Sequence, residues 1–279
     1  MSFFRKIFDL FLFSSLFIAI CAVIMTFQTN QLLSLDYDHR HYAAFVFFST
    51  ICSYNFHWYL TPASCTERTR AHWTRQNKLL HLLLFIAGGI GAAWYFFSFQ
   101  QVWFWLMVPV ILTFLYSAPK LPYGPFRWLK KVAIGKTIFL SMVWLYVTTL
   151  APMLISEQPL QTSFVLFACS RFFLIYAICI LFDYRDREED KKDGIRSMIT
   201  YFSEQGITIL FYGSLAAFAA ATAALYLYGV SWYVVLALLL PGLIVMALFN
   251  TAKRNFSDYL YYFVLDGLMM FSALFTLFW

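Results

Sequence analysis

Long apolar runs separated by short polar stretches follow one another along the whole chain. Most of these runs reach the roughly 20 residues that an α-helix needs to cross the hydrocarbon core of a bilayer. The connections between them leave no room for a soluble domain, so we expect a single polytopic membrane domain over residues 1–279. The pattern predicts nine transmembrane helices, over residues 7–27, 41–60, 79–98, 102–117, 133–155, 163–182, 205–228, 231–250 and 259–279.

The composition agrees with this pattern. Hydrophobic residues make up 62% of the chain and charged residues only 12%, whereas a soluble domain carries about 25% charged residues. An all-α integral membrane protein is therefore expected. The first apolar run follows Arg5 and Lys6 but is too long for a signal peptide and lacks a cleavage site of small residues, which indicates a retained helix.

The basic residues predict the orientation of the chain. With nine spans, all 20 Lys and Arg residues except Arg40 and Arg171 fall on one side. Basic loops stay in the cytoplasm, so we expect a cytoplasmic N-terminus and, in a bacterium, a place in the inner membrane. The net charge of +6 then reflects topology and attraction to anionic lipids or phosphates. No nucleic-acid motif is present, and no nucleic-acid partner is expected.

The most charged stretch, DYRDREEDKKDGIRS (residues 183–197), follows the sixth predicted span. Asp183, Asp186 and Asp190 are spaced by three and four residues, so they share one face if the helix continues. Carboxylates at this spacing repel one another, and the negative end of the helix dipole adds to the cost. A divalent cation such as Mg²⁺, which prefers oxygen ligands, would remove both penalties.

A second interpretation of the same stretch needs no metal. Three carboxylates have a basic residue four positions away: Asp183 with Arg187, Glu189 with Arg185, and Glu188 with Lys192. A loop that carries such ion pairs is normally a solvated surface. The spacing alone leaves both interpretations open.

The acidic stretch resembles the second Asp-rich motif of the UbiA-type intramembrane prenyltransferases, which reads roughly DxxDxxxD followed by Gly, a basic residue and Ser or Thr. The residues that match it in order are Asp183, Asp186, Asp190, Gly194, Arg196 and Ser197. The segment FLYSAPKLPYGPFRWLKK (residues 114–131) resembles the region after the fourth helix of that family, through Tyr116, Ser117 and Lys120.

The sequence departs from the family where the first Asp-rich motif is expected, after the second predicted span. Asn55 in SYNFHWYLTPASCTERTR matches the leading Asn of that motif. Phe56, Tyr59 and Ala63 stand where the aspartates belong. The departure leaves three possibilities open: a metal site with one motif, a shifted site that uses nearby residues, or a protein that no longer catalyses. The possible substitutes for the first motif are His57, Glu67, Arg68 and Arg70.

The resemblance implies nine helices around a central cavity and an Mg²⁺-dependent transfer of a prenyl group from an allylic prenyl diphosphate to a hydrophobic acceptor within the membrane. It implies that Asp183, Asp186 and Asp190 hold the metal. The residues that it places at the diphosphate are Lys120, Lys130, Lys131 and Arg196, and those that it places at the substrate are Asn55, His57, Tyr116 and Ser197. The active face would be cytoplasmic, with the acceptor entering from the lipid.

Two other functions stay open. A non-catalytic relative that binds a lipid or a partner protein would explain the missing first motif. An unrelated transporter would need charges in the middle of the membrane, at which only Arg171 and Asp266 hint. Ionisable residues at that depth are usually paired or functional, and we expect these two to form a buried ion pair that fixes helix packing.

Overall fold

The computed structural model describes residues 3–61, 69–117, 136–192 and 197–277, and within these ranges every regular element is a helix. The helices are α1 (Phe3–Phe13), α2 (Leu16–Leu32), α3 (His39–Tyr59), α4 (Thr69–Gln76), α5 (Lys78–Phe96), η1 (Phe97–Phe99), α6 (Trp103–Ser117), α8 (Lys136–Leu145), η4 (Tyr146–Leu150), α9 (Ala151–Ile155), α10 (Thr162–Lys192), α11 (Met198–Tyr201), α12 (Glu204–Ala224), η5 (Leu225–Tyr228), α13 (Trp232–Arg254), η6 (Leu260–Leu265), α14 (Asp266–Met270) and α15 (Ala273–Thr276).

The all-helical membrane character of the sequence is confirmed. Among the described residues, five helical stretches are long and apolar enough to cross a bilayer, and α1 with α2 makes a sixth if the pair forms one bent span. The helix α6 and the stretch Leu260–Thr276 are apolar but shorter. Each predicted span overlaps a helix, but the number of nine crossings and the cytoplasmic N-terminus stay predictions.

The first predicted span, over residues 7–27, is not one straight helix. It breaks between α1 and α2, whose axes differ by 55°. Ser15, at the start of α2, adopts a left-handed backbone conformation with φ of 71°, which ends the regular hydrogen bonding of α1. The prediction of a continuous helix was therefore wrong at this serine.

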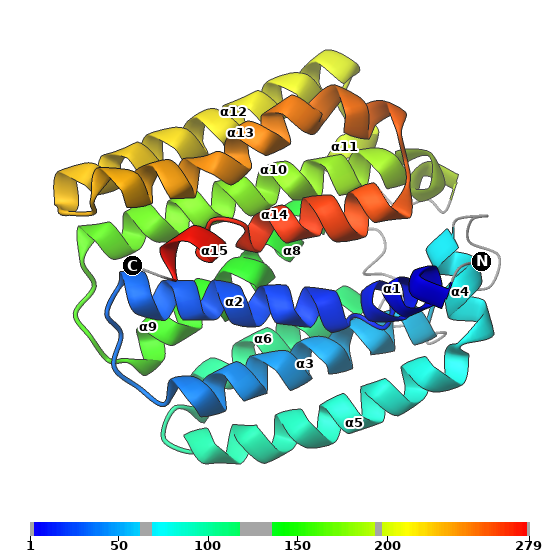
Figure 1. Ribbon diagram of the computed structural model, residues 1–279, viewed down its shortest axis with the longest axis horizontal. Helices are drawn as coiled ribbons and strands as arrows, with labels where there is room; N and C mark the ends of the chain where they lie inside the picture. Colours follow the sequence, from blue (N-terminus) through cyan, green and yellow to red (C-terminus); the bar gives the residue numbers. More distant parts are fainter. Residues whose placement is uncertain (1–2, 62–68, 118–135, 193–196, 278–279) are drawn as a thin grey trace.

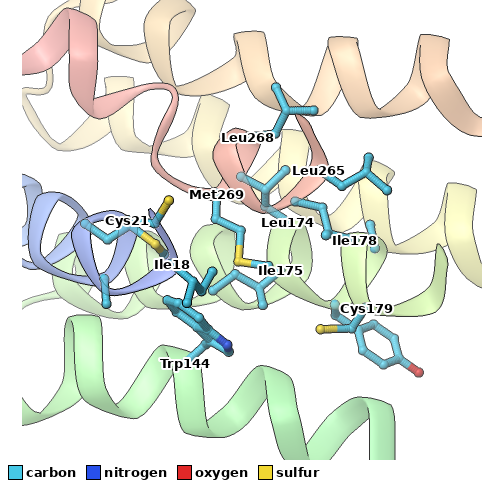
Figure 2. Close-up of a cluster of buried hydrophobic side chains, with 14 of the residues drawn as sticks. Ile18, Cys21, Trp144, Leu174, Ile175, Ile178, Cys179, Leu265, Leu268 and Met269 are labelled. Carbon is cyan, nitrogen blue, oxygen red and sulfur yellow. The ribbon is translucent and has the colours of Figure 1, made fainter. Parts of the chain in front are cut away.

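The long helix α10 lies at the centre of the bundle (Figure 1) and contacts α8, α12 and α13. It runs toward the end of the molecule where α1, α4 and α11 gather, on the right of Figure 1. Buried side chains of α2, α8, α10 and α14 meet in the middle of the bundle (Figure 2), among them Ile18, Trp144, Ile175, Cys179 and Met269. Because Cys179 precedes Asp183 by one helical turn, this apolar core reaches up to the acidic stretch.

A polar network crosses this core at Arg171 of α10. Its guanidinium donates to the Met25 and Thr148 carbonyl oxygens at 2.9 and 3.1 Å. It also donates to three side-chain oxygens, at 2.6 to 3.1 Å, which belong to Gln28, Thr29 and Thr149. Thr148 lies in the π-helix η4, a type of turn that disturbs the regular backbone ladder. The expected ion pair between Arg171 and Asp266 is not formed, because neutral oxygens of α2 and η4 surround the cation.

A cavity of about 520 Å³ opens at the other end of the bundle, near the start of α10. Its lining includes Gln31, Gln158, Phe164 and Tyr228 and contains no acidic or basic residue. The central cavity that the family resemblance implies stays a prediction, since apolar side chains occupy the middle of the bundle (Figure 2).

Candidate functional site

Asp183 and Asp190, two helical turns apart on α10, meet the first residues of α8. The Lys136 ammonium lies 3.5 Å from Oδ1 of Asp183 and 3.1 Å from Oδ2 of Asp190. The Thr137 hydroxyl donates a hydrogen bond to Oδ2 of Asp183. One cation of the chain therefore bridges the first and third carboxylates of the predicted motif.

These two carboxylates are buried: each side chain is 8% exposed. The alternative of a solvated acidic loop is therefore wrong for them. The proposed pair of Asp183 with Arg187 is absent, because Arg187 instead donates to Glu204 at 2.7 Å. The solvated description fits the outer face of α10, where Glu188 is 74% exposed and pairs with Lys191.

The middle carboxylate of the motif faces a different cation. Oδ1 of Asp186 lies 3.0 Å from Nε of Arg185. Arg185 is buried and donates to the Tyr262 hydroxyl at 2.9 Å, and it lies 3.8 Å from the Asp258 carboxylate. Through Arg185, the motif contacts a second cluster of charges. This cluster includes Asp258 and Tyr262, near the start of the last predicted span.

Arg70 of α4 completes this second cluster. Its guanidinium carbon lies 4.1 Å from the ring centres of both Trp58 and Tyr262, and its backbone N–H donates to Asp258 at 2.8 Å. Burial lowers the pKa of the Arg70 guanidinium from its ordinary value, because desolvation disfavours the charged form. Aromatic faces attract such a desolvated cation. Of the proposed substitutes for the first motif, Arg70 therefore lies in the charge cluster beside Arg185.

Two aromatic residues that the sequence assigned to the substrate lie together. The rings of His57 and Tyr116 stack with their centres 5.3 Å apart, and Tyr116 lies parallel to Phe139 of α8 at 6.4 Å. Nδ1 of His57 is 3.5 Å from the Ser117 hydroxyl. Phe139 follows Lys136 by three residues on α8, so the ring of Tyr116 lies on the side of α8 that carries Lys136.

The other two residues proposed to contact the substrate, Asn55 and Ser197, form hydrogen bonds within the protein. Asn55 is fully buried, donates to the Ser14 carbonyl oxygen at 3.0 Å and shares a 2.7 Å hydrogen bond with Nδ1 of His81. Ser197 caps the short helix α11 by accepting from the Thr200 backbone N–H. The remaining candidates lie outside the described residues; they are Glu67, Arg68, Lys120, Lys130, Lys131 and Arg196.

The donors at this site suit a hard cation. Among the described residues, no three side chains of His, Cys, Asp or Glu converge closely enough to hold a metal ion. Mg²⁺ needs only one or two carboxylates in proteins and completes its shell with water and substrate phosphates. The space between Asp183 and Asp190 already holds a cation, the Lys136 ammonium. A divalent ion therefore fits these donors if that ammonium moves.

Sequence reasoning missed Lys136 and Thr137. Lys136 counted only as one of the basic residues after the fourth predicted span, which decide the orientation. A usable signal was its position at the membrane boundary, where a lysine with a threonine beside it begins an otherwise apolar helix. Asp258 and Tyr262 carried no motif and could be found only from the fold.

Comparisons with known proteins agree with the architecture. A model of the UbiA prenyltransferase family matches residues 5–274. A UbiA homologue from Archaeoglobus fulgidus bound to Cd²⁺ superposes with a TM-score of 0.64 at 14% identity, over 97% of this chain and 99% of that one. The apo structure of a homologue from Aeropyrum pernix K1 gives a TM-score of 0.63 at 13% identity, over 93% and 98%. None of the curated proteins matches the sequence.

Proposed function

The chain belongs to the UbiA prenyltransferase family, and from this premise we propose that it transfers a prenyl group from an allylic prenyl diphosphate to a hydrophobic acceptor within the membrane. The observation that carries the proposal is the end of α10. There the family's second motif continues an apolar helix without a break and brings the buried carboxylates of Asp183 and Asp190 to one partly buried cation, the Lys136 ammonium.

The difficult part of such a transfer is the departure of diphosphate, which gathers negative charge as the carbon–oxygen bond breaks. We assign Asp183, Asp186 and Asp190 to holding Mg²⁺, which supplies electrostatic stabilisation of that leaving group. Charge-assisted hydrogen bonds from lysine and arginine to phosphate oxygens add to it. The candidates for this contact remain Lys120, Lys130, Lys131 and Arg196. Arg70 is enclosed by two aromatic rings. We propose that its positive charge stabilises the diphosphate from a distance and that its guanidinium does not contact the phosphate oxygens.

The allylic carbon becomes cationic as diphosphate leaves, and it must be kept from water. We place it beside the stacked rings of Tyr116 and His57, since electron-rich faces stabilise a neighbouring cation. The apolar prenyl chain would enter beside Cys179, Ile175 and Trp144 and would have to displace side chains that fill the middle of the bundle (Figure 2). The acceptor, being hydrophobic, would reach the same place from the lipid.

We place the active face in the cytoplasm and, for a bacterial chain, the protein in the inner membrane. The support is the distribution of basic residues, which favours that side for the end that carries the acidic stretch. Arg70, Lys136, Arg185, Arg187 and Lys253 all belong to the charge networks of this end. Membrane lipids, prenyl diphosphate and the acceptor are the proposed partners.

The test is binding of a non-hydrolysable prenyl diphosphate analogue to the detergent-purified protein, with and without Mg²⁺. Asp186→Asn removes one motif charge from a side chain that is 27% exposed. Glu188→Gln, on the exposed face of the same helix, is the matched control. We expect Mg²⁺-dependent binding in the wild type and the control, and a loss of about tenfold or more in Asp186→Asn, since such a change corresponds to about 1.4 kcal/mol.

The same experiment distinguishes the proposed enzyme from a non-catalytic relative. The observation that favours such a relative is the replacement of the first motif, where Phe56 and Tyr59 occupy aspartate positions. If the wild type shows no Mg²⁺-dependent binding, or if Asp186→Asn and Glu188→Gln bind like the wild type, the prenyltransferase proposal is wrong. The chain is then a lipid- or partner-binding relative of the enzymes.

A further inference from the structure

We propose that Lys136 is a tethered counter-ion that closes the carboxylate site to free Mg²⁺, so that metal and diphosphate bind together or not at all. The inference deepens the proposed function and rests on it. It concerns a residue outside the Asp-rich motifs, and its subject is how this one site selects what it binds.

The geometry gives Lys136 the position of a bound cation. Its ammonium contacts Asp183 and Asp190 at 3.5 and 3.1 Å, with both carboxylates buried. Thr137, the next residue of α8, adds a hydroxyl donor to Asp183. Two carboxylates enclosed in this way would repel each other strongly without a cation, because burial removes the screening by water. Lys136 therefore offsets one of the two negative charges and stabilises the carboxylate pair.

Asp186, the middle carboxylate of the motif, has a separate partner. Asp186 pairs with Arg185, which belongs to the cluster of Asp258 and Tyr262. The charge balance between Asp183 and Asp190 thus depends on Lys136.

A free divalent ion must compete with this ammonium. If Mg²⁺ takes Asp183 and Asp190, the ammonium has to leave its buried carboxylates, and leaving a buried charge without a partner is strongly unfavourable. Mg²⁺ also gives up its water reluctantly. The metal alone is therefore expected to bind weakly.

Diphosphate removes this obstacle. Its oxygens accept the ammonium released from the carboxylates, as lysine does at many phosphate sites, and they also complete the shell of the metal. The lysine side chain is flexible enough to make this exchange. Metal and diphosphate then raise each other's affinity by the same factor, because thermodynamic coupling between two ligands is reciprocal.

The experiment compares the wild type with Lys136→Met, a side chain of similar length without the charge. Mn²⁺ alone is the first probe, with bound and free ion separated by electron paramagnetic resonance on the detergent-purified full chain. The second probe is the non-hydrolysable prenyl diphosphate analogue at fixed Mg²⁺. Lys253→Met is the matched control, since Lys253 pairs with Glu204 at 2.7 Å at the same end but outside the motif.

We expect opposite changes from the two probes. Lys136→Met should bind Mn²⁺ alone about tenfold more tightly than the wild type and bind the analogue about tenfold more weakly, within the usual range of coupling between sites. Lys253→Met should change neither. General damage to the fold would weaken both, so the opposite signs identify the counter-ion role. Lys136→Gln serves the same purpose if the methionine variant does not fold.

Three outcomes overturn the inference. One is tight binding of Mn²⁺ alone by the wild type, a measurement that needs no variant. The second is equal Mn²⁺ affinity in the wild type and Lys136→Met. The third is weaker binding of both probes by the variant. In each case the proposed function still stands if the wild type binds the analogue with Mg²⁺, and it fails separately if the wild type does not.

Discussion

Two cations of this protein, Arg171, which is buried, and Lys136, which is partly buried, are held in different ways. Arg171, in the middle of α10, is surrounded by five neutral oxygen acceptors. Lys136, the first residue of α8, lies beside the end of α10 and is held by the carboxylates of Asp183 and Asp190. Both are held by residues distant in sequence, so long-range contacts alone do not distinguish a structural site from a functional one.

The difference lies in what each cation could exchange. The carbonyl and hydroxyl oxygens around Arg171 carry no net charge, and they link α2 and η4 to α10 through one fork of donors. The carboxylates around Lys136 carry charge that another cation can satisfy, and an ion pair of this kind is weak support for stability. The neighbouring cluster of Arg70 and Arg185 is also less complete than that of Arg171, since Nε of Arg70 has no hydrogen-bond partner among the described residues. The arrangement around Arg171 suits a fixed contact between helices, which we call the fixed joint, whereas the arrangement around Lys136 suits the binding of ions.

The largest expected effect tests the fixed joint. Arg171→Met removes all five hydrogen bonds and leaves several buried acceptors without a donor. Because each such acceptor costs about 1–3 kcal/mol, we expect the free energy of unfolding to fall by about 3 kcal/mol. Thermal unfolding in detergent measures the loss. Protein that remains folded should bind the prenyl diphosphate analogue as the wild type does.

The control for this change is Arg254→Met, at an exposed position at the end of α13, where surface substitutions usually stay within about 0.5 kcal/mol. If Arg171→Met is as stable as this control, the polar network is not a joint. If it folds normally but loses the analogue, Arg171 belongs to the binding site, and the distinction between the two clusters fails.

An intermediate effect is expected at Arg70. Arg70→Gln removes a guanidinium held between Trp58 and Tyr262, and a desolvated contact between a cation and an aromatic ring contributes about 2 kcal/mol. We expect the free energy of unfolding to fall by about that amount, measured by thermal unfolding. Affinity for the analogue should change less than about threefold, because in our proposal Arg70 acts on the diphosphate from a distance and does not contact it.

Arg70→Lys sharpens this test, because it keeps the charge but not the planar group that stacks on rings. It should lose stability like the glutamine variant and keep the affinity of the wild type. A loss of about tenfold or more in affinity for Arg70→Gln alone would instead show that Arg70 contacts diphosphate and replaces the first Asp-rich motif.

Much of the architecture could be predicted from the sequence, because in a bilayer the length of an apolar run largely determines the helix. The prediction failed where a local choice of backbone conformation decided the outcome. Ser14 and Ser15 gave no reason to expect a break, yet the left-handed conformation of Ser15 bends the first span by 55°. The burial of Asp183 and Asp190 could not be predicted either, because the sequence does not show how far α10 continues as a buried helix.

The acidic motif could be found because its members are close in sequence and share the periodicity of one helix. Lys136 lies 47 positions before Asp183 and Arg70 lies 188 positions before Asp258, so no local spacing connects them. The failed ion pair of Arg171 and Asp266 has the same cause. Two lone charges in apolar spans suggested an ion pair. Only the fold shows that oxygen atoms of α2 and η4 accept the hydrogen bonds of the Arg171 guanidinium.

The smallest effect is expected at a third set of charges, which is open to water. The Glu204 carboxylate accepts from Lys253 and Arg187 at 2.7 Å while its side chain is 55% exposed. Exposed pairs contribute about 0–1 kcal/mol, so Glu204→Gln should lower the free energy of unfolding by about 0.5 kcal/mol at low salt. At about 1 M salt, where screening acts over about 3 Å, the loss should disappear. Unfolding at both salt concentrations measures this, with binding of the analogue unchanged in each. If the free energy of unfolding instead falls by more than about 2 kcal/mol and salt does not reduce this loss, Glu204 is a structural contact like Arg171. The exposure of a charged side chain would then not distinguish a structural contact from a solvated ion pair.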